Sequence, residues 1–210
     1  MIASIVHHTP NPEYWIAYLA RVSSPKNQER MEKGELDGAG LIRYCAEHGH
    51  WSVFEMANVV MKIKTTRAIS AQILRHRSFS FQEFSQRYSK VESFRNPEMR
   101  AAGSSNRQSS QEVMKSDRVL ELVENGVFEA YQSYKKLLEG GVAPETARMI
   151  LPLCTPTKLY MNGTVRSWIH YLEVRCKEDT QKEHREVALA CRKVLADLLP
   201  TCAEVFGWKE

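Results

Sequence analysis

Residues 72–89 are the most informative stretch of this chain and read QILRHRSFSFQEFSQRYS. The triplet Arg75-His76-Arg77 is followed by Glu83, Arg87 and several serine hydroxyls. Guanidinium groups, imidazoles and hydroxyls are side chains with which proteins hold phosphate. Because successive residues of a helix point about 100° apart, we expect the triplet to fan around the end of a helix, where neighbouring side chains contact different ligands.

The segments around this stretch alternate between strand and helix patterns. Val59–Ile63 has the period of two of a half-buried strand, and Ala68–Leu74 has helical spacing. A helix beginning near Thr65 or Thr66 would therefore end with the triplet, where cations also complement the helix dipole. The other predicted elements are a strand at 2–7, helices at 12–19, 41–49, 119–138 and 144–151, a strand at 153–161, and two helices within 164–199.

Two polar stretches are predicted to be loops. Residues 23–40 contain three glycines and many charged side chains, and we expect at most one helical turn there. Residues 92–117 form a longer polar segment that we expect to be mobile. A lid over a ligand is one interpretation of this segment, and a passive surface insertion is the favoured one.

The composition is that of an ordinary globular protein of 210 residues, with 43% hydrophobic and 26% charged residues. This length predicts one domain. The net charge of +4 favours small anions over nucleic acid as partners. No segment approaches the roughly 18 apolar residues of a membrane span, and no secretion signal is recognised. Five widely spaced cysteines without a C-x-x-C pair argue against disulfides and predict the cytoplasm or another reducing intracellular compartment.

No residue lies in a sequence context typical of a catalytic nucleophile or a metal site. Ser78 and Ser80 lie near His76 but outside any G-x-S-x-G turn, and no cysteine lies beside a histidine. The pair His48 and His50 lacks further ligands at useful spacing, so no metal is predicted. Both common glycine-rich phosphate motifs are absent, and a nucleotide would be held mainly by arginines.

Three candidate binding residues fall in one predicted helix. Arg166 and His170 are four residues apart and share a face, whereas Arg175 points to the opposite side. Two faces indicate two binding tasks. The alternative is a solvated helix whose charges form surface salt bridges.

The spacing R-H-R-x-x-S-x-x-x-x-S-x-R between Arg75 and Arg87 resembles the signature of the flavin-dependent thymidylate synthases. The likeness covers most of the chain and is weakest in residues 92–117. Further matches follow in the family's order at ARVS (20–23), Gly49-His50, Phe54-Glu55, ARMILP (147–152), and Arg166, His170, Arg175, Gln181 and Arg185.

This resemblance implies a fold and an activity. The fold is α/β (α+β), with a central twisted sheet flanked by helices, in a single domain at 1–210 that assembles as a homotetramer with sites at subunit interfaces. The reaction is reductive methylation of dUMP to dTMP. Methylenetetrahydrofolate donates the one-carbon unit, FAD is the cofactor, and NADPH reduces it. Neither nucleic acid nor a membrane is an expected partner.

The resemblance also assigns residues by position. FAD would contact Ser52, Arg75, His76, Arg77, Thr164, Val165, Arg166 and His170. The nucleotide dUMP would contact Gln72, Arg75, Glu83, Phe84, Ser85, Gln86, Arg87, Arg148 and Arg175, with loop 83–87 reaching from a neighbouring subunit. Two positions depart from the family pattern: Thr164 replaces a common asparagine that would bond the flavin, and Met56 replaces a usual histidine at the periphery of the site.

Arg175 matches the family's proposed catalytic arginine. A guanidinium stays protonated in proteins and is a poor general base, so we expect Arg175 to stabilise negative charge developing on the uracil ring. The family needs no enzyme nucleophile, which agrees with the lack of a credible serine or cysteine candidate.

Three other functions fit the same arginines. A nonenzymatic nucleotide- or RNA-binding module would use Arg75, Arg77, Arg87 and Tyr88 for phosphate contacts and stacking. An unrelated flavin reductase would bind FAD but ignore dUMP. A helical scaffold would carry these arginines only as surface charge.

Overall fold

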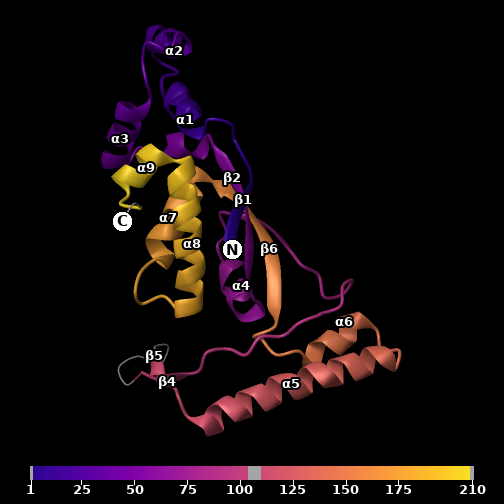
Figure 1. The fold of residues 1–210 in the computed structure, drawn as a ribbon. Coiled ribbons are helices and arrows are strands. Elements are labelled where there is room, and N and C mark those ends of the chain that lie inside the picture. The colour runs from indigo at the N-terminus through magenta and orange to yellow at the C-terminus, as the bar shows by residue number, and fades with distance from the viewer. Residues whose placement is uncertain (1, 104–109, 209–210) are drawn as a thin grey trace. The chain divides into compact units, whose positions relative to one another are not determined.

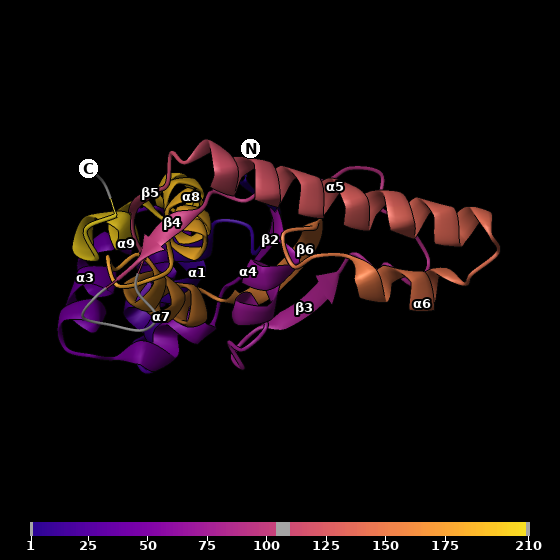
Figure 2. The same ribbon diagram turned by 90° about the horizontal axis from the view of Figure 1, so that it is seen from below.

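The computed structural model describes residues 2–103 and 110–208 (Figures 1 and 2). Helices and strands occur in mixed order, mostly in runs of two or more of the same kind. In order they are β1 (Ala3–His8), α1 (Pro12–Ala20), α2 (Pro25–Glu32), α3 (Ala39–Glu47), η1 (Trp51–Glu55), β2 (Asn58–Thr66), α4 (Arg67–Ile73), β3 (Ser80–Glu83), β4 (Arg100–Ala102), β5 (Ser110–Val113), α5 (Asp117–Glu139), α6 (Pro144–Ala147), η2 (Arg148–Ile150), β6 (Pro156–Thr164), α7 (Val165–Arg175), α8 (Lys182–Leu198) and α9 (Pro200–Val205).

Four strands form one sheet in the order β1-β2-β6-β3. β1 lies at an edge and pairs antiparallel with β2, with Ala3 opposite Ile63. In β2 the side chains of Val59, Met61 and Ile63 are fully buried and alternate with more exposed residues. This is the predicted period of two, and the mixed α/β architecture is confirmed.

The chain divides into two compact units. The first comprises the chain up to Ile63, the segment His76–Gln82 and the chain from Tyr160 onward, and the second comprises Lys64–Arg75 and Glu83–Leu159. Each unit has its own packed elements, and each carries part of the predicted site.

Helix α7 is central to the first unit. It packs against η1 and lies beside α8, as Figure 1 shows. Six of its residues are buried, among them Trp168 and Tyr171, so the helix is not solvated on all sides, although its exposed Arg166 forms a salt bridge with Glu55. Trp168 is fully buried and donates its indole N–H to the backbone carbonyl of Val59 at 3.1 Å, which ties the helix to the sheet.

The long helix α5 organises the second unit. It lies alongside α6 (Figure 2), and its fully buried Tyr134 accepts a hydrogen bond from the backbone N–H of Val91 at 3.2 Å. Tyr134 packs with Val91 and Ala147 in a hydrophobic cluster. Helix α5 begins and ends close to its predicted limits, and Gly141 follows it in the left-handed conformation at φ 85°. Within the described ranges, no helix is long and apolar enough to cross a membrane.

Some predicted boundaries are wrong. Residues 25–32 form helix α2 rather than a loop, because Pro25 begins it and Lys33 pairs with Glu29, although only Met31 is buried. Strand β3 and helix α9 were not predicted, and β6 begins three residues later than expected and continues through Gly163. In the segment 92–117, β4 and β5 form an antiparallel pair, while residues 104–109 lie outside the described part.

Candidate functional site

The signature triplet lies just beyond helix α4. Thr66 precedes the helix in extended conformation, and the helix ends at Ile73, so Arg75, His76 and Arg77 occupy the following turn instead of fanning around its last residues. Arg75 and Arg77 are exposed, and His76 is half-buried. The turn leads into β3, the four-residue strand Ser80-Phe81-Gln82-Glu83, which was not predicted.

The segment that follows the triplet is held against the strand β6 and the helix α7 in the first unit. Phe79 is buried where Gly163 offers no side chain, since a Cβ at Gly163 would lie 2.4 Å from the Phe79 ring. The Ser167 hydroxyl donates to the Ser78 carbonyl at 3.2 Å. These contacts place the turn along α7, with its histidine near the C-terminal end of that helix.

Arg175 and His76 are in direct contact. The Arg175 Nε–H donates to the His76 Nε2 atom at 2.9 Å. The family resemblance assigned His76 to FAD and Arg175 to dUMP, and the structure brings the two side chains together. Because the imidazole accepts at Nε2, it carries no proton there and is neutral.

Two buried side chains lie behind His76. The Tyr171 ring meets the His76 ring edge-on, with centroids 5.0 Å apart, and the Tyr171 hydroxyl lies 3.2 Å from His184 Nε2. Burial, followed by the positive charge of Arg175, lowers the pKa of His184 from 6.5 to about 4, and burial raises the pKa of Tyr171. Both groups are therefore neutral near pH 7. Neither was predicted, because a single buried histidine or tyrosine is most often part of a core.

The residues assigned to FAD, apart from Arg75, belong to the first unit, and they lie along α7 rather than at one end: Thr164, Val165 and Arg166 are at its beginning, whereas His76 contacts Arg175 at its end. The Thr164 hydroxyl accepts the backbone N–H of Ser167 at 3.2 Å and thereby caps this helix. Arg166 pairs with Glu55 at the end of η1, the short helix that also carries Ser52. His170, one turn later, is exposed.

This donor set fits a flavin dinucleotide. The exposed guanidinium groups of Arg77 and Arg166 and the helix N-terminus at Val165 suit a pyrophosphate, which binds to cations and to backbone N–H groups. Thr164, where the family resemblance leads us to expect an asparagine, uses its hydroxyl to cap α7.

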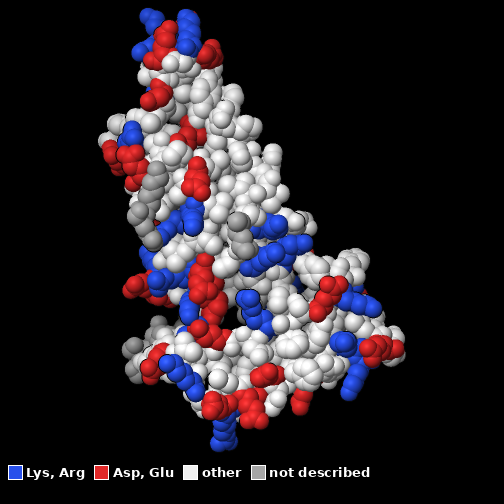
Figure 3. Space-filling model, viewed as in Figure 1, with Lys and Arg blue, Asp and Glu red and all other residues white. Residues whose placement is uncertain are grey.

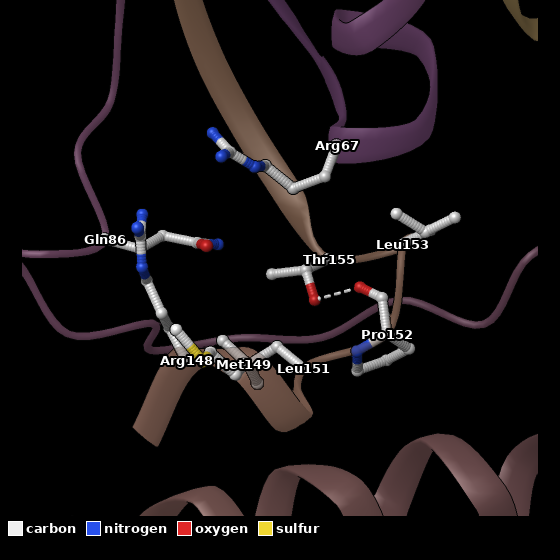
Figure 4. A pocket seen from close by; sticks show the side chains of 8 residues that line it. All are labelled: Arg67, Gln86, Arg148, Met149, Leu151, Pro152, Leu153 and Thr155. Atoms are coloured by element: carbon white, nitrogen blue, oxygen red, sulfur yellow. Dashed lines mark hydrogen bonds between the residues drawn. The ribbon is translucent and has the colours of Figure 1, made fainter. Parts of the chain in front are cut away.

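A pocket of about 270 Å³ lies in the second unit (Figure 4). Arg67 comes from the first turn of α4, Gln86 from the loop after β3, and Arg148 from the start of η2. Figure 4 shows these three polar side chains extending toward the same space. The lining is completed by Met149, Leu151, Pro152, Leu153 and Thr155.

Gln86 is the least satisfied polar side chain of this pocket. It is only 5% exposed, and its Nε2 atom has no hydrogen-bond partner. Among the described residues, no other buried side-chain nitrogen or oxygen is left unpaired. An unpaired buried donor costs about 1–3 kcal/mol, which a ligand oxygen in the pocket would recover.

Glu83 is held beside this pocket by three donors on one oxygen. Its Oε1 accepts from Arg67 Nη1 at 2.8 Å, Ser70 Oγ at 2.7 Å and Thr157 Oγ1 at 2.9 Å. These three bonds fix the orientation of the carboxylate and leave its second oxygen, Oε2, to accept a hydrogen bond from a ligand. Arg67 was not predicted as a site residue, although a lone arginine opening an apolar helix after a strand is a recognisable anomaly.

Most other residues assigned to dUMP also lie in the second unit. Ser85 Oγ accepts from the Arg87 backbone N–H at 3.4 Å, and the Phe84 N–H donates to the Lys158 carbonyl at 2.8 Å. Arg87 pairs with Glu145 at 3.4 Å on an exposed surface. Gln72 lies in α4 and is half-buried. Arg175 is the exception, since it belongs to the first unit.

The five cysteines are all free thiols. Burial is the main cause that raises the thiol pKa of each of them, most strongly at Cys191 and Cys202. A raised pKa disfavours the thiolate, which is the reactive form.

Known proteins resemble this chain over nearly its whole length. The family model described as thymidylate synthase complementing protein matches residues 4–201. A flavin-dependent thymidylate synthase of Synechocystis is 49% identical over 201 residues, covering 94% of this chain and 91% of that protein. A probable flavin-dependent thymidylate synthase of Paramecium bursaria Chlorella virus 1 is 43% identical, covering 97% and 94%.

A solved structure shows the same fold. The crystal structure of the UMP/dUMP methylase PolB from Streptomyces cacaoi, bound with 5-Br dUMP, matches with a TM-score of 0.81 at 28% identity, and the match covers 98% of this chain and 94% of that chain. Sequence family and fold agree. The chain therefore belongs to the family of the flavin-dependent thymidylate synthases.

Proposed function

We propose that this protein converts dUMP to dTMP, with methylenetetrahydrofolate as one-carbon donor, FAD as cofactor and NADPH as the reductant of FAD. When bound, FAD supplies the hydride that reduces the transferred carbon to a methyl group. The pocket of the second unit carries this proposal, because Gln86 presents a buried, unpaired amide there beside Arg148. The methylase PolB, bound with a halogenated dUMP, supports the same ligand class.

The second unit binds the nucleotide in this proposal. The Gln86 amide donates to an acceptor oxygen of dUMP, and the Arg148 guanidinium faces its phosphate. Glu83, fixed through Oε1, offers its second oxygen to a donor group of the nucleotide. A volume of about 270 Å³ suits one small nucleotide or part of it.

Arg175 in the first unit carries the electrostatic part of the reaction. Its guanidinium stabilises negative charge that develops on the uracil ring when carbon 5 becomes nucleophilic. No enzyme nucleophile takes part, because the raised thiol pKa values keep the cysteines protonated.

We further propose that the protein works as a homotetramer with loop 83–87 shared between subunits. Met149 and Leu153, which line the pocket, are 77% and 70% exposed, and Leu122 on α5 is 64% exposed. Exposed apolar residues around a ligand pocket favour coverage by another subunit. Light scattering coupled to size-exclusion chromatography measures the oligomeric state of the protein. A fully active monomer would contradict the proposed tetramer.

An RNA-binding module is less well supported. On the face in Figure 3, acidic and basic side chains are interspersed over α5, whose sequence has five acidic and three basic residues. A nucleic-acid surface requires a predominantly basic stripe. Such a module would also show a steep salt dependence of binding.

The deciding experiment has two stages. The absorbance spectrum of the purified protein supplied with FAD is expected to show bound flavin, and the reduced flavin is expected to be reoxidised under anaerobic conditions only when both dUMP and methylenetetrahydrofolate are present, with dTMP as product. Reoxidation without dUMP would indicate an unrelated reductase. A folded protein that binds neither FAD nor dUMP would contradict the proposal.

A further inference from the structure

The contact between Arg175 and His76 uses the Nε–H of the guanidinium group and leaves its two terminal nitrogens to a ligand. The Nε–H lies on the side of the group and donates to His76 at 2.9 Å, while the terminal NH₂ groups of Arg175 have no hydrogen-bond partner in the described part of the chain. A guanidinium held in this way keeps its two terminal nitrogens pointing outward as a planar pair.

The neutral state of His76 matters for the charge of Arg175. A carboxylate partner would orient the guanidinium equally well but would also compensate its positive charge. An imidazole that accepts at Nε2 orients it and leaves that charge uncompensated. Such a partner suits an arginine that must stabilise an anion.

The His76 ring is itself fixed by fully buried side chains. Tyr171 meets it at 5.0 Å and an angle of 77°, and His184 lies behind with its ring 6.3 Å away. The hydroxyl of Tyr171 and Nε2 of His184 lie 3.2 Å apart and satisfy each other inside the core. His76 therefore has little freedom to turn away from Arg175.

We propose that His76 is the positioning residue of Arg175, and that the buried pair of Tyr171 and His184 holds the His76 ring in the orientation that this contact requires. His76 acts through Arg175 and need not touch the reacting atoms. The proposal rests on the proposed function and adds to it a physical reason for the histidine within the signature triplet.

A kinetic double-mutant cycle between His76 and Arg175 tests this coupling. His76→Leu is expected to lower the rate of dTMP formation at saturating dUMP and FAD by about 10- to 100-fold, the loss expected for one hydrogen bond to a charged group. His76→Gln is expected to recover most of that rate, because its Oε1 atom can accept from Arg175. Combined with Arg175→Lys, His76→Leu is expected to cause no further loss.

Two outcomes would overturn the proposal. One is a double variant whose loss is the product of the two single losses, and the other is a His76→Gln variant as slow as His76→Leu. Flavin content is measured in every variant, so that weakened FAD binding is separated from a slower reaction. If the wild type makes no dTMP, the proposed function fails instead.

The contact itself is tested without catalysis. In ¹⁵N NMR spectra of histidine-labelled wild-type protein, the His76 Nε2 resonance is expected to be that of an unprotonated nitrogen, and it is expected to move in the Arg175→Ala variant. Tyr171→Phe keeps the ring against His76 and is expected to change this resonance less than Arg175→Ala does. A protonated Nε2 near neutral pH would overturn the geometry on which the proposal depends.

Discussion

Two arginines, one in each unit, are oriented by different partners. In the second unit Arg67 pairs with the Glu83 carboxylate at 2.8 Å, and in the first unit Arg175 donates to the neutral imidazole of His76 at 2.9 Å. The charge of Arg67 is compensated, and that of Arg175 is not. The partner of an arginine, more than its position in the fold, indicates whether the residue serves the structure or the chemistry.

Arg175→Lys is expected to have the largest effect. An amine replaces neither the Nε contact to His76 nor the planar pair of terminal nitrogens, so the rate of dTMP formation should fall by about 100- to 1000-fold with little change in stability. Steady-state kinetics and thermal unfolding measure the two effects. Arg43→Lys, at an exposed pair with Glu204, is the matched control and should leave turnover unchanged. Near-normal turnover of Arg175→Lys would remove the proposed role.

The neutral environment behind His76 predicts a loss of stability in acid. The pKa of His184 is about 4 in the folded protein against 6.5 when unfolded, so the unfolded state takes up a proton first as the pH falls. The contribution of neutral His184 to the free energy of unfolding is complete above pH 6.5. It decreases progressively toward pH 4, by up to about 3 kcal/mol. Urea unfolding between these pH values, compared with His184→Gln, measures the difference. Equal pH dependence in the two proteins would contradict this expectation.

Arg67→Met should affect stability. It leaves Glu83, whose side chain is 16% exposed, with two hydroxyl donors and no cation. The free energy of unfolding is expected to fall by about 1.5–3 kcal/mol, the usual contribution of a hydrogen bond to a charged group. Arg43→Met breaks an exposed pair and should cost less than about 1 kcal/mol. If the two variants lost equal stability, the compensated arginine of the second unit would have no special structural role.

Gln86→Leu separates binding from stability in the same pocket. The affinity for dUMP is expected to fall about tenfold, because the ligand loses a buried donor, whereas the ligand-free protein should not be destabilised, because the amide has no partner to lose. Titration with dUMP and urea unfolding test the two halves. Gln28→Leu is a useful contrast, since Gln28 donates to the Tyr18 carbonyl at 3.1 Å and its loss should reduce stability only.

Replacing all five cysteines by alanine or serine should have the smallest effect on turnover. Their pKa values are raised by burial, and none is expected to act as a nucleophile. Some stability should be lost at the fully buried Cys191 and Cys202. Loss of dTMP formation in a folded, flavin-bound variant would contradict a mechanism without an enzyme nucleophile.

Much of the fold follows from local patterns in the sequence. The buried alternation of β2, the long amphipathic helix α5 and the proline that begins α1 were predicted, because each depends on residues close together in the chain. Helix α2 was missed because only Met31 of its eight residues is buried. Strand β3 was missed because its four residues include only one large apolar side chain, Phe81, which is too few to show a period of two.

The candidate site was only partly predictable. The spacing of the signature indicated the family and its residues, among them Gln86 and Arg148. The contribution of Arg67 to the pocket was not visible, because Arg67 and Arg148 are 81 residues apart in sequence and meet only through folding. The exposed Met149 and Leu153 beside it could not be told from ordinary core residues.

By itself the sequence determined the family, the set of side chains available for binding and catalysis, and most of the helices and strands, because side-chain type and spacing are local properties of the chain. Only the tertiary structure decided which groups meet. The 2.9 Å contact between Arg175 and His76, the three donors on Glu83 and the unpaired amide of Gln86 depend on elements distant in sequence. A hydrogen bond requires its two atoms within about 3.5 Å, and no pattern of spacing along a chain specifies that distance.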